Sequence, residues 1–246
     1  MGKTVTFTAA AGLVVALAAF AGPARADLMG ELGILDVSGT NPATGETWAL
    51  GDEYRLAFIT STNPGATLTD IADYNALVQG LADAAGLGDA TWNVIGSTSL
   101  VDARDNTSTN PTVDGPGMPI LLVDGITVVA NDYADLWDHS VQHIIDQTET
   151  GATKAHWPFT GSYWDGTVST GKPNTGGGPL GSPGEVTQGN GSNATDWVWR
   201  QWTSDPSATA LPLYAMSDTL TVVPEPATMS LLALGGLAML RRRRRA

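Results

Sequence analysis

Two histidines in the sequence have a spacing that could bind a metal ion. His139 and His143 stand at i and i+4, so on a helix both imidazoles would lie on one face, with His156 as a third ligand. Zinc peptidases of the HExxH kind need a glutamate directly after the first histidine as general base, and Ser140 stands there instead. We therefore expect hydrogen-bonded surface histidines rather than a catalytic metal.

Three aspartates offer a second candidate metal site. Asp132, Asp135 and Asp138 recur every three residues and carry the hard oxygen ligands that calcium prefers. Their spacing is not that of an EF-hand loop, so two hypotheses stay open: a structural calcium ion, and carboxylates that cap turns. Apart from this calcium ion, we predict no cofactor.

The sequence shows no signature of a catalytic centre. It contains no Gly-x-Ser-x-Gly motif, its glycines at 176–178 are not followed by lysine, and it has no cysteine. The lack of cysteine excludes thiolate chemistry, and the sequence gives no support for an α/β-hydrolase nucleophile or a phosphate-binding loop. The chain has 25 acidic residues and hence many carboxylate pairs, so a glycosidase-type site remains an alternative. We assign no catalytic residue.

The tryptophans suggest a binding face. Six of the eight lie in the second half of the chain, close to tyrosines and carboxylates, and flat rings beside polar groups suit carbohydrate. The other interpretation is that these rings fill the core of a domain without disulfides, and we assign Trp92, Trp137 and two of the tryptophans at 197–202 to that core. The candidate ligand face consists of Trp157, Tyr163 and Trp164.

The net charge of the body argues against nucleic acid as a partner. Between Asp27 and Val223 there are 24 acidic residues (25 minus Glu225) and 5 basic ones, which gives 5 − 24 = −19. Binding DNA or RNA requires lysines and arginines that neutralise phosphates, and this segment has few.

Hydrophobic patterning predicts one small α+β domain over residues 54–222, with one main amphipathic helix, short antiparallel strands and long loops. The helix is expected over 67–85, where Thr67 and Asp70 are placed as in a capping box and Gly86 ends the helix. Its apolar stripe is expected to consist of Ile71, Tyr74, Leu77 or Val78, Leu81 and Ala85.

The strands are expected to be short and separated by turns. Asp124-Gly125 predicts a hairpin that joins 119–123 to 126–130. Residues 171–191 are rich in glycine and proline and predict a long loop. The other strands are expected at 54–61, 91–97, 157–163, 197–202 and 213–222.

The N-terminus has the three parts of a secretory signal peptide, residues 1–26. Lys3 provides the positive start, 9–20 form the apolar run, and Ala24 and Ala26 are the small residues that a signal peptidase recognises. The mature chain is expected to begin near Asp27, with an N-terminal extension over 27–53.

The C-terminal tail, residues 223–246, combines three features. Pro224, Glu225 and Pro226 form the first, and the second is an apolar run of 14 uncharged residues, 227–240. As a transmembrane-like helix this run reaches about 21 Å, short of a hydrocarbon core of about 30 Å. The third is the cluster Arg241, Arg242, Arg243, Arg244 and Arg245, which can snorkel and is expected to stop the chain on the cytoplasmic side of the membrane.

Together these features resemble the PEP-CTERM sorting signal. The resemblance implies that an exosortase, an integral membrane processing enzyme of Gram-negative bacteria, recognises the tail. It also implies export, transient anchoring in the inner membrane, processing near Pro-Glu-Pro, and delivery to the cell surface or extracellular matrix.

Several short motifs stand out in the body, at 92–98, 103–107, 123–125, 134–138 and 157–161. Through these motifs the body is similar to bacterial exported domains of unknown function with a C-type-lectin-like or endostatin-like organisation. This chain departs from them by its lack of cysteines and by the segment 171–191, and sugar binding does not follow from such a fold.

These observations lead to one functional expectation and two alternatives. We expect an exported, non-enzymatic surface or matrix protein whose domain contacts exopolysaccharide. The alternatives are a secreted hydrolase that acts on matrix polymers and a purely structural surface component.

Overall fold

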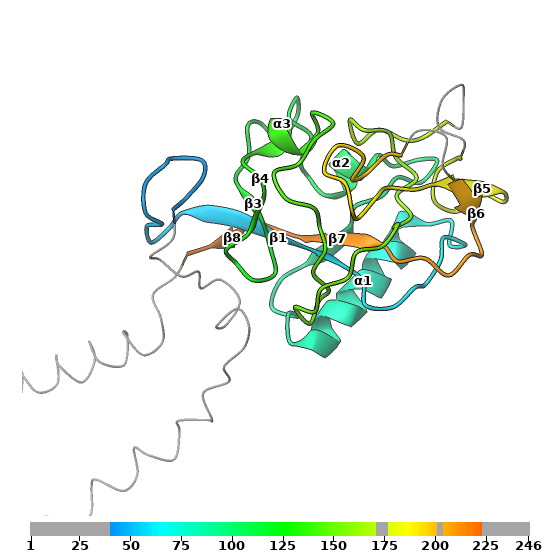
Figure 1. Cartoon of the computed structure of the whole chain (residues 1–246), viewed down its shortest axis with the longest axis horizontal. Coiled ribbons are helices and arrows are strands. Elements are labelled where there is room, and N and C mark those ends of the chain that lie inside the picture. Colours follow the sequence, from blue (N-terminus) through cyan, green and yellow to red (C-terminus); the bar gives the residue numbers. More distant parts are fainter. Residues whose placement is uncertain (1–39, 171–176, 201–203, 223–246) are drawn as a thin grey trace, which may run out of the picture.

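A six-stranded mixed sheet forms the centre of the body (Figure 1). The structure is a computed structural model that describes residues 40–170, 177–200 and 204–222. The central strand is β1 (Glu53–Ile59), and β8 (Leu220–Thr221) pairs with its first residues. The order of the remaining strands is β2 (Trp92–Val94), β7 (Tyr214–Ser217), β1, β3 (Ile120–Leu122) and β4 (Val128–Ala130).

Both faces of β1 are covered, which explains why all its residues after Glu53 are buried. Alternate side chains point to opposite faces of a strand. Leu56 and Phe58 join one hydrophobic cluster, and Ala57 and Ile59 join another. Helix α1 (Ile71–Ala85) packs on the first face, as Figure 1 shows, through Tyr74, Val78 and Ala82. The second cluster includes buried residues of α2 (Ala103–Asn106) and α3 (Tyr133–Leu136).

The prediction of a mixed domain with one main helix is confirmed, but the expected start of the helix is wrong. Helix α1 begins at Ile71 and not at Thr67, because the carboxylate of Asp70 caps it by accepting a hydrogen bond from the N–H of Ala72 at 3.0 Å. Its end is as predicted, with Gly86 in a left-handed conformation at φ 87°. The buried residues of the helix are Tyr74, Val78 and Ala82. Of the residues predicted for the apolar stripe, Leu81 and Ala85 are only half-buried.

The expectation of purely antiparallel strands is also wrong. Strand β1 pairs in parallel with β3, with Arg55 opposite Ile120 and Ala57 opposite Leu122. Parallel neighbours need a long crossover connection, and the sixty residues from Thr60 to Pro119 (119 − 59) supply it. The remaining pairs of the sheet are antiparallel.

The hairpin of β3 and β4 is confirmed, and its turn is built around one carboxylate. Asp124 accepts hydrogen bonds from the N–H groups of Ile126 and Thr127, both at 2.8 Å, and from the Gln147 amide at 2.9 Å. Burial tends to raise the pKa of this carboxyl, but these hydrogen bonds together outweigh burial and lower it below its usual value.

Three other local predictions are wrong. Residues 157–163 form isolated bridges at Phe159 and Ser162 rather than a strand, and Pro158 within the segment has no N–H to donate. Residues 197–200 form a bend and irregular chain rather than a strand, and the Trp197 carbonyl accepts from the N–H of Asn190. The expected long loop contains β5 (Glu185–Thr187), which pairs with β6 (Ser204–Pro206); its residues 171–176 lie outside the described part, as do 201–203.

The two ends of the described chain meet at the same edge of the body. The expected strand over 213–222 divides into β7 and β8, and Val222 then exchanges backbone hydrogen bonds with Gly51 and Asp52. The described part of the N-terminal extension packs on the domain through Trp48, whose ring centroid lies 5.9 Å from that of Tyr54. The predicted signal peptide and the tail lie outside the described residues. Among the helices that are described, none is long and apolar enough to cross a membrane.

Candidate ligand-binding face

The three histidines do not share a site. The segment of His139 and His143 is not helical, so their spacing does not bring them to one face. His139 contacts aromatic rings, the Nδ1 atom of His143 lies 2.8 Å from the Ile144 carbonyl oxygen, and His156 accepts a hydrogen bond from the N–H of Trp157. Within residues 40–170, 177–200 and 204–222, no three His, Cys, Asp or Glu side chains are grouped to hold a metal ion.

The three aspartates of the calcium hypothesis cap turns. Asp132 caps α3 and accepts from the Asp135 N–H at 2.8 Å. Asp135 in turn accepts from the Asn131 N–H at 2.6 Å and from the Gln142 amide, and Asp138 accepts from the N–H of Ser140. The calcium site stays a prediction to which these contacts add no support.

Two of the three rings predicted to form a ligand face do gather at the surface, with two partners that the sequence did not reveal. We call the cluster His139, Tyr163, Trp164 and Trp199 the ring face. The His139 imidazole lies 6.0 Å from the Trp164 ring and 5.8 Å from the Trp199 ring, and Tyr163 lies 6.2 Å from Trp199. Trp164 is 42% exposed, so part of its ring is open to solvent.

A tight turn at 163–166 places Trp164 outward. The Gly166 N–H donates to the Tyr163 carbonyl, and the Asp165 carboxylate accepts from the N–H and the hydroxyl of Thr167. Gly166 has φ 77°, and a Cβ atom there would lie 2.8 Å from the ring of Trp137. Only glycine adopts this backbone conformation readily and also leaves room for the Trp137 ring. Gly166 therefore allows the turn to pack directly on Trp137.

Buried rings support the ring face from below. Trp137 lies 5.6 Å from Trp197, and Trp197 lies 6.0 Å from Tyr214 of β7. Trp92 packs on Phe58 in the other cluster at 4.8 Å. The assignment of Trp92 and Trp137 to the core is therefore confirmed, as is that of one of the tryptophans at 197–202, namely Trp197.

The ring face contains two local costs in free energy. His139 has φ 86°, a left-handed conformation that costs a non-glycine residue on the order of 1 kcal/mol. The indole N–H of Trp199 is buried and has no hydrogen-bond partner among the described residues, which is rare in folded proteins.

The third predicted residue, Trp157, has a different partner. The Arg200 guanidinium lies over its ring, 5.1 Å from the centroid, and the ring is 46% exposed. Arg200 is held by its N–H, which donates to the Gln188 carbonyl at 2.8 Å. Because Arg200 directly follows Trp199, the Trp157–Arg200 pair and the ring face are joined through one segment of chain.

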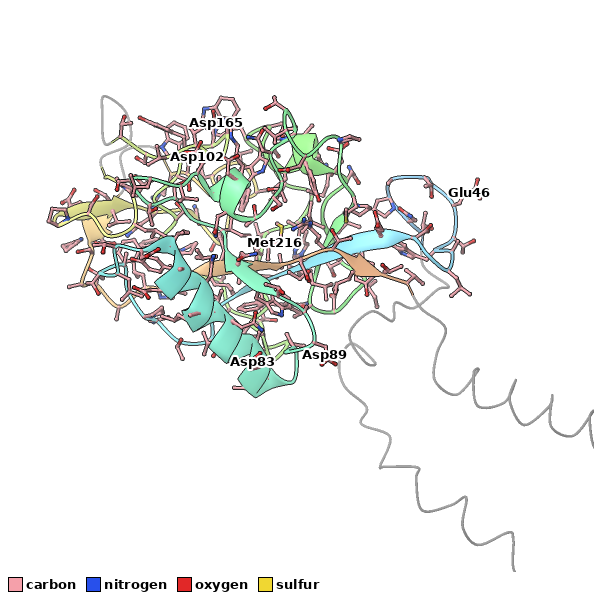
Figure 2. The ribbon with its side chains drawn as sticks, turned by 180° about the vertical axis from the view of Figure 1, so that it is seen from behind. Glu46, Asp83, Asp89, Asp102, Asp165 and Met216 are labelled. Carbon is pink, nitrogen blue, oxygen red and sulfur yellow. The ribbon has the colours of Figure 1, made fainter. Side chains whose placement is uncertain are left out.

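The face lies far from the point where the tail leaves the body. Figure 2 shows Asp165, in the turn that carries Trp164, and Glu46, beside the first strand, toward opposite ends of the molecule. Val222, the last described residue before the tail, bonds to Gly51 and Asp52 at the Glu46 end.

The comparison with family models addresses the tail. Residues 222–245 match the model described as the PEP-CTERM protein-sorting motif. The chain carries this sorting signal. It is therefore an exported protein directed to an exosortase, with transient membrane anchoring before processing, as the motif at Pro224, Glu225 and Pro226 predicted. No curated protein matches the chain.

Sequence reasoning missed Trp199 and His139 as parts of the face, and Arg200 as the partner of Trp157. The alternation in Trp197-Val198-Trp199 predicts a strand with both rings on one face. The structure has no strand there, and Trp197 is fully buried while Trp199 is only partly buried. The contact between residues 139 and 199, sixty positions apart, has no signal in a single sequence.

Proposed function

We propose that this PEP-CTERM protein is a non-enzymatic module of the cell surface or extracellular matrix that binds exopolysaccharide through its ring face. The observation that carries the proposal is the half-exposed Trp164, whose ring contacts His139, which in turn contacts Trp199. Apolar sugar faces stack on such rings, and hydroxyl groups bond to neighbouring polar atoms.

Two polar groups next to the rings fit this role. Asp138 and Asp165 directly adjoin His139 and Trp164, and the contacts described above use one carboxylate oxygen of each, Oδ1. The second oxygen of each carboxylate can accept from a sugar hydroxyl. The separation of the three histidines favours a binding module over a metal-dependent hydrolase.

The site lies where an anchored or released protein could use it. Since the ring face is remote from Val222, ligand binding and tail processing need not compete for space. The module could therefore bind polymer both before and after an exosortase acts.

Retention of the full chain on the producing organism's own exopolysaccharide tests the proposal. Trp164→Ala is expected to weaken retention about two- to tenfold, because stacking on one ring contributes about 0.5–1.5 kcal/mol. Leu100→Ala, which removes another exposed apolar side chain, is the matched control and should bind like the wild type. Equal retention of the Trp164 variant and the wild type would refute the ring face as the site.

The same assay with calcium and with EDTA tests the remaining prediction for Asp132, Asp135 and Asp138. Retention lost in EDTA and restored by calcium would support a calcium ion in that loop, and retention unchanged by EDTA would leave the three carboxylates as turn caps only.

A further inference from the structure

The basic residues of the body differ in how fully they are paired. Arg55 is buried and donates to two backbone carbonyls from Nη1 alone, those of Thr107 and Ser217. The Lys154 ammonium donates to the Thr60 and Ser61 carbonyls and to the Asn63 amide oxygen. Both cations are committed to holding the fold together.

Arg200 is different. The ion pairs among the described residues are Arg104 with Asp102 at 4.0 Å and His143 with Asp146 at 3.9 Å, and Arg200 takes part in neither. In a segment of net charge −19, a guanidinium that has no carboxylate partner among the described residues is unexpected, because acids outnumber bases 24 to 5. Asp205 on β6 is an acid close to Arg200 in the sequence, and its carboxylate accepts a hydrogen bond from the side-chain amide of Gln188.

What holds Arg200 instead is the exposed Trp157 ring. Stacking on an aromatic face orients the guanidinium and leaves its N–H fork, at the edge of the plane, able to bind a planar anion in a bidentate manner. A carboxylate is the planar anion of matching geometry. The ring and the fork together are suited to a sugar that carries a carboxylate.

We propose that Trp157 and Arg200 form a subsite for a uronate residue of the polysaccharide, with the sugar ring on Trp157 and its carboxylate on Arg200. This inference rests on the proposed function and deepens it, because it assigns the polymer to the acidic class. The subsite joins the ring face through the Trp199–Arg200 segment, so an extended chain of sugars can contact both.

The experiment measures binding of the full chain, in mild detergent, to polygalacturonate and to its fully methyl-esterified form. The two polymers share the sugar and differ in the charge of the carboxyl group. We expect the wild type to prefer the charged polymer, and Arg200→Gln to weaken binding to it about tenfold, the size of one charge-assisted contact. Binding to the ester should change less than twofold.

Two further variants separate recognition from general charge. Arg104→Gln removes the same charge elsewhere and should leave binding to both polymers unchanged. Arg200→Lys keeps the charge without the planar fork and should recover only part of the lost affinity. An equal loss in the Arg104 and Arg200 variants, or no preference for the charged polymer, would overturn the subsite.

Failure of the subsite and failure of the proposed function give different results. If the organism's own exopolysaccharide is retained through Trp164 while polygalacturonate is not, the uronate assignment is wrong and the ring face stands. If no polymer is retained at all, the proposed function fails and the subsite fails with it.

Discussion

Two arginine–aromatic pairs in this protein have nearly the same geometry and opposite surroundings. Arg55 lies 5.4 Å from the centre of the Tyr133 ring, and Arg200 lies 5.1 Å from that of Trp157. Arg55 is 6% exposed and also donates from Nε to the Tyr133 hydroxyl at 2.9 Å. Stacking on a ring therefore does not by itself define the role of an arginine. Its role depends on how many of its N–H donors are already hydrogen-bonded within the fold.

The strongest test of this comparison is the removal of Arg55. Arg55→Ala would leave the Thr107 and Ser217 carbonyls and the Tyr133 hydroxyl without their buried donor. We expect a loss of about 3 kcal/mol or more in the free energy of unfolding, measured by urea denaturation. A loss below about 1 kcal/mol would mean that water replaces the guanidinium and that Arg55 is not a structural residue.

A narrower change removes only one partner of Arg55. Tyr133→Phe keeps the ring beneath the guanidinium but deletes the hydroxyl that accepts from Nε. A hydrogen bond to a charged donor is worth about 1.5–3 kcal/mol, so we expect a loss in that range by the same denaturation measurement. Tyr163→Phe, which deletes the hydroxyl of a half-exposed tyrosine, is the control and should cost less.

A third prediction concerns pH and Asp124, a half-buried carboxylate that accepts several hydrogen bonds within the fold. The pKa of Asp124 is lowered below its usual 3.8 in the folded state, so its stabilising contribution is present above that value and is lost as pH falls through it. Asp124→Asn should therefore unfold with a shallower dependence on pH between about 5 and 2. Acid titrations followed by tryptophan fluorescence measure this slope, with the exposed Asp89→Asn as control, and equal slopes would contradict the prediction.

The smallest effect is expected at Arg200. Arg200→Ala removes a cation from an exposed ring and should change the free energy of unfolding by no more than about 0.5–1 kcal/mol. Arg55→Ala and Arg200→Ala are chemically identical substitutions. The difference between their losses in the free energy of unfolding is therefore the most direct measure of the comparison. A loss at Arg200 as large as that at Arg55 would show that the surface pair is structural.

The sequence predicted local structure best where one residue decides the backbone. Gly86 ended the helix and Asp124-Gly125 formed the hairpin turn as expected, because glycine conformation and side-chain caps act over a few residues. The parallel pairing of β1 with β3 was not predicted, since it depends on a crossover whose direction leaves no local pattern.

The candidate site was predicted in part for the same reason. Tyr163 and Trp164 are neighbours in sequence, and their joint exposure follows from one turn. Their contacts with His139 and Trp199 depend on three distant segments that meet only in the folded state. Trp157 was named for its ring, but its partner Arg200 comes from a segment expected to be a strand.

The strand order has a consequence for the timing of export. A chain that crosses a membrane from its N-terminus delivers β1 early, yet β1 is completed only by β7 and β8, which end at Thr221. The central strand therefore waits for its last neighbours until the sorting tail itself reaches the membrane. Because such non-local pairings form slowly, we expect the sheet to be completed only after Thr221 has crossed.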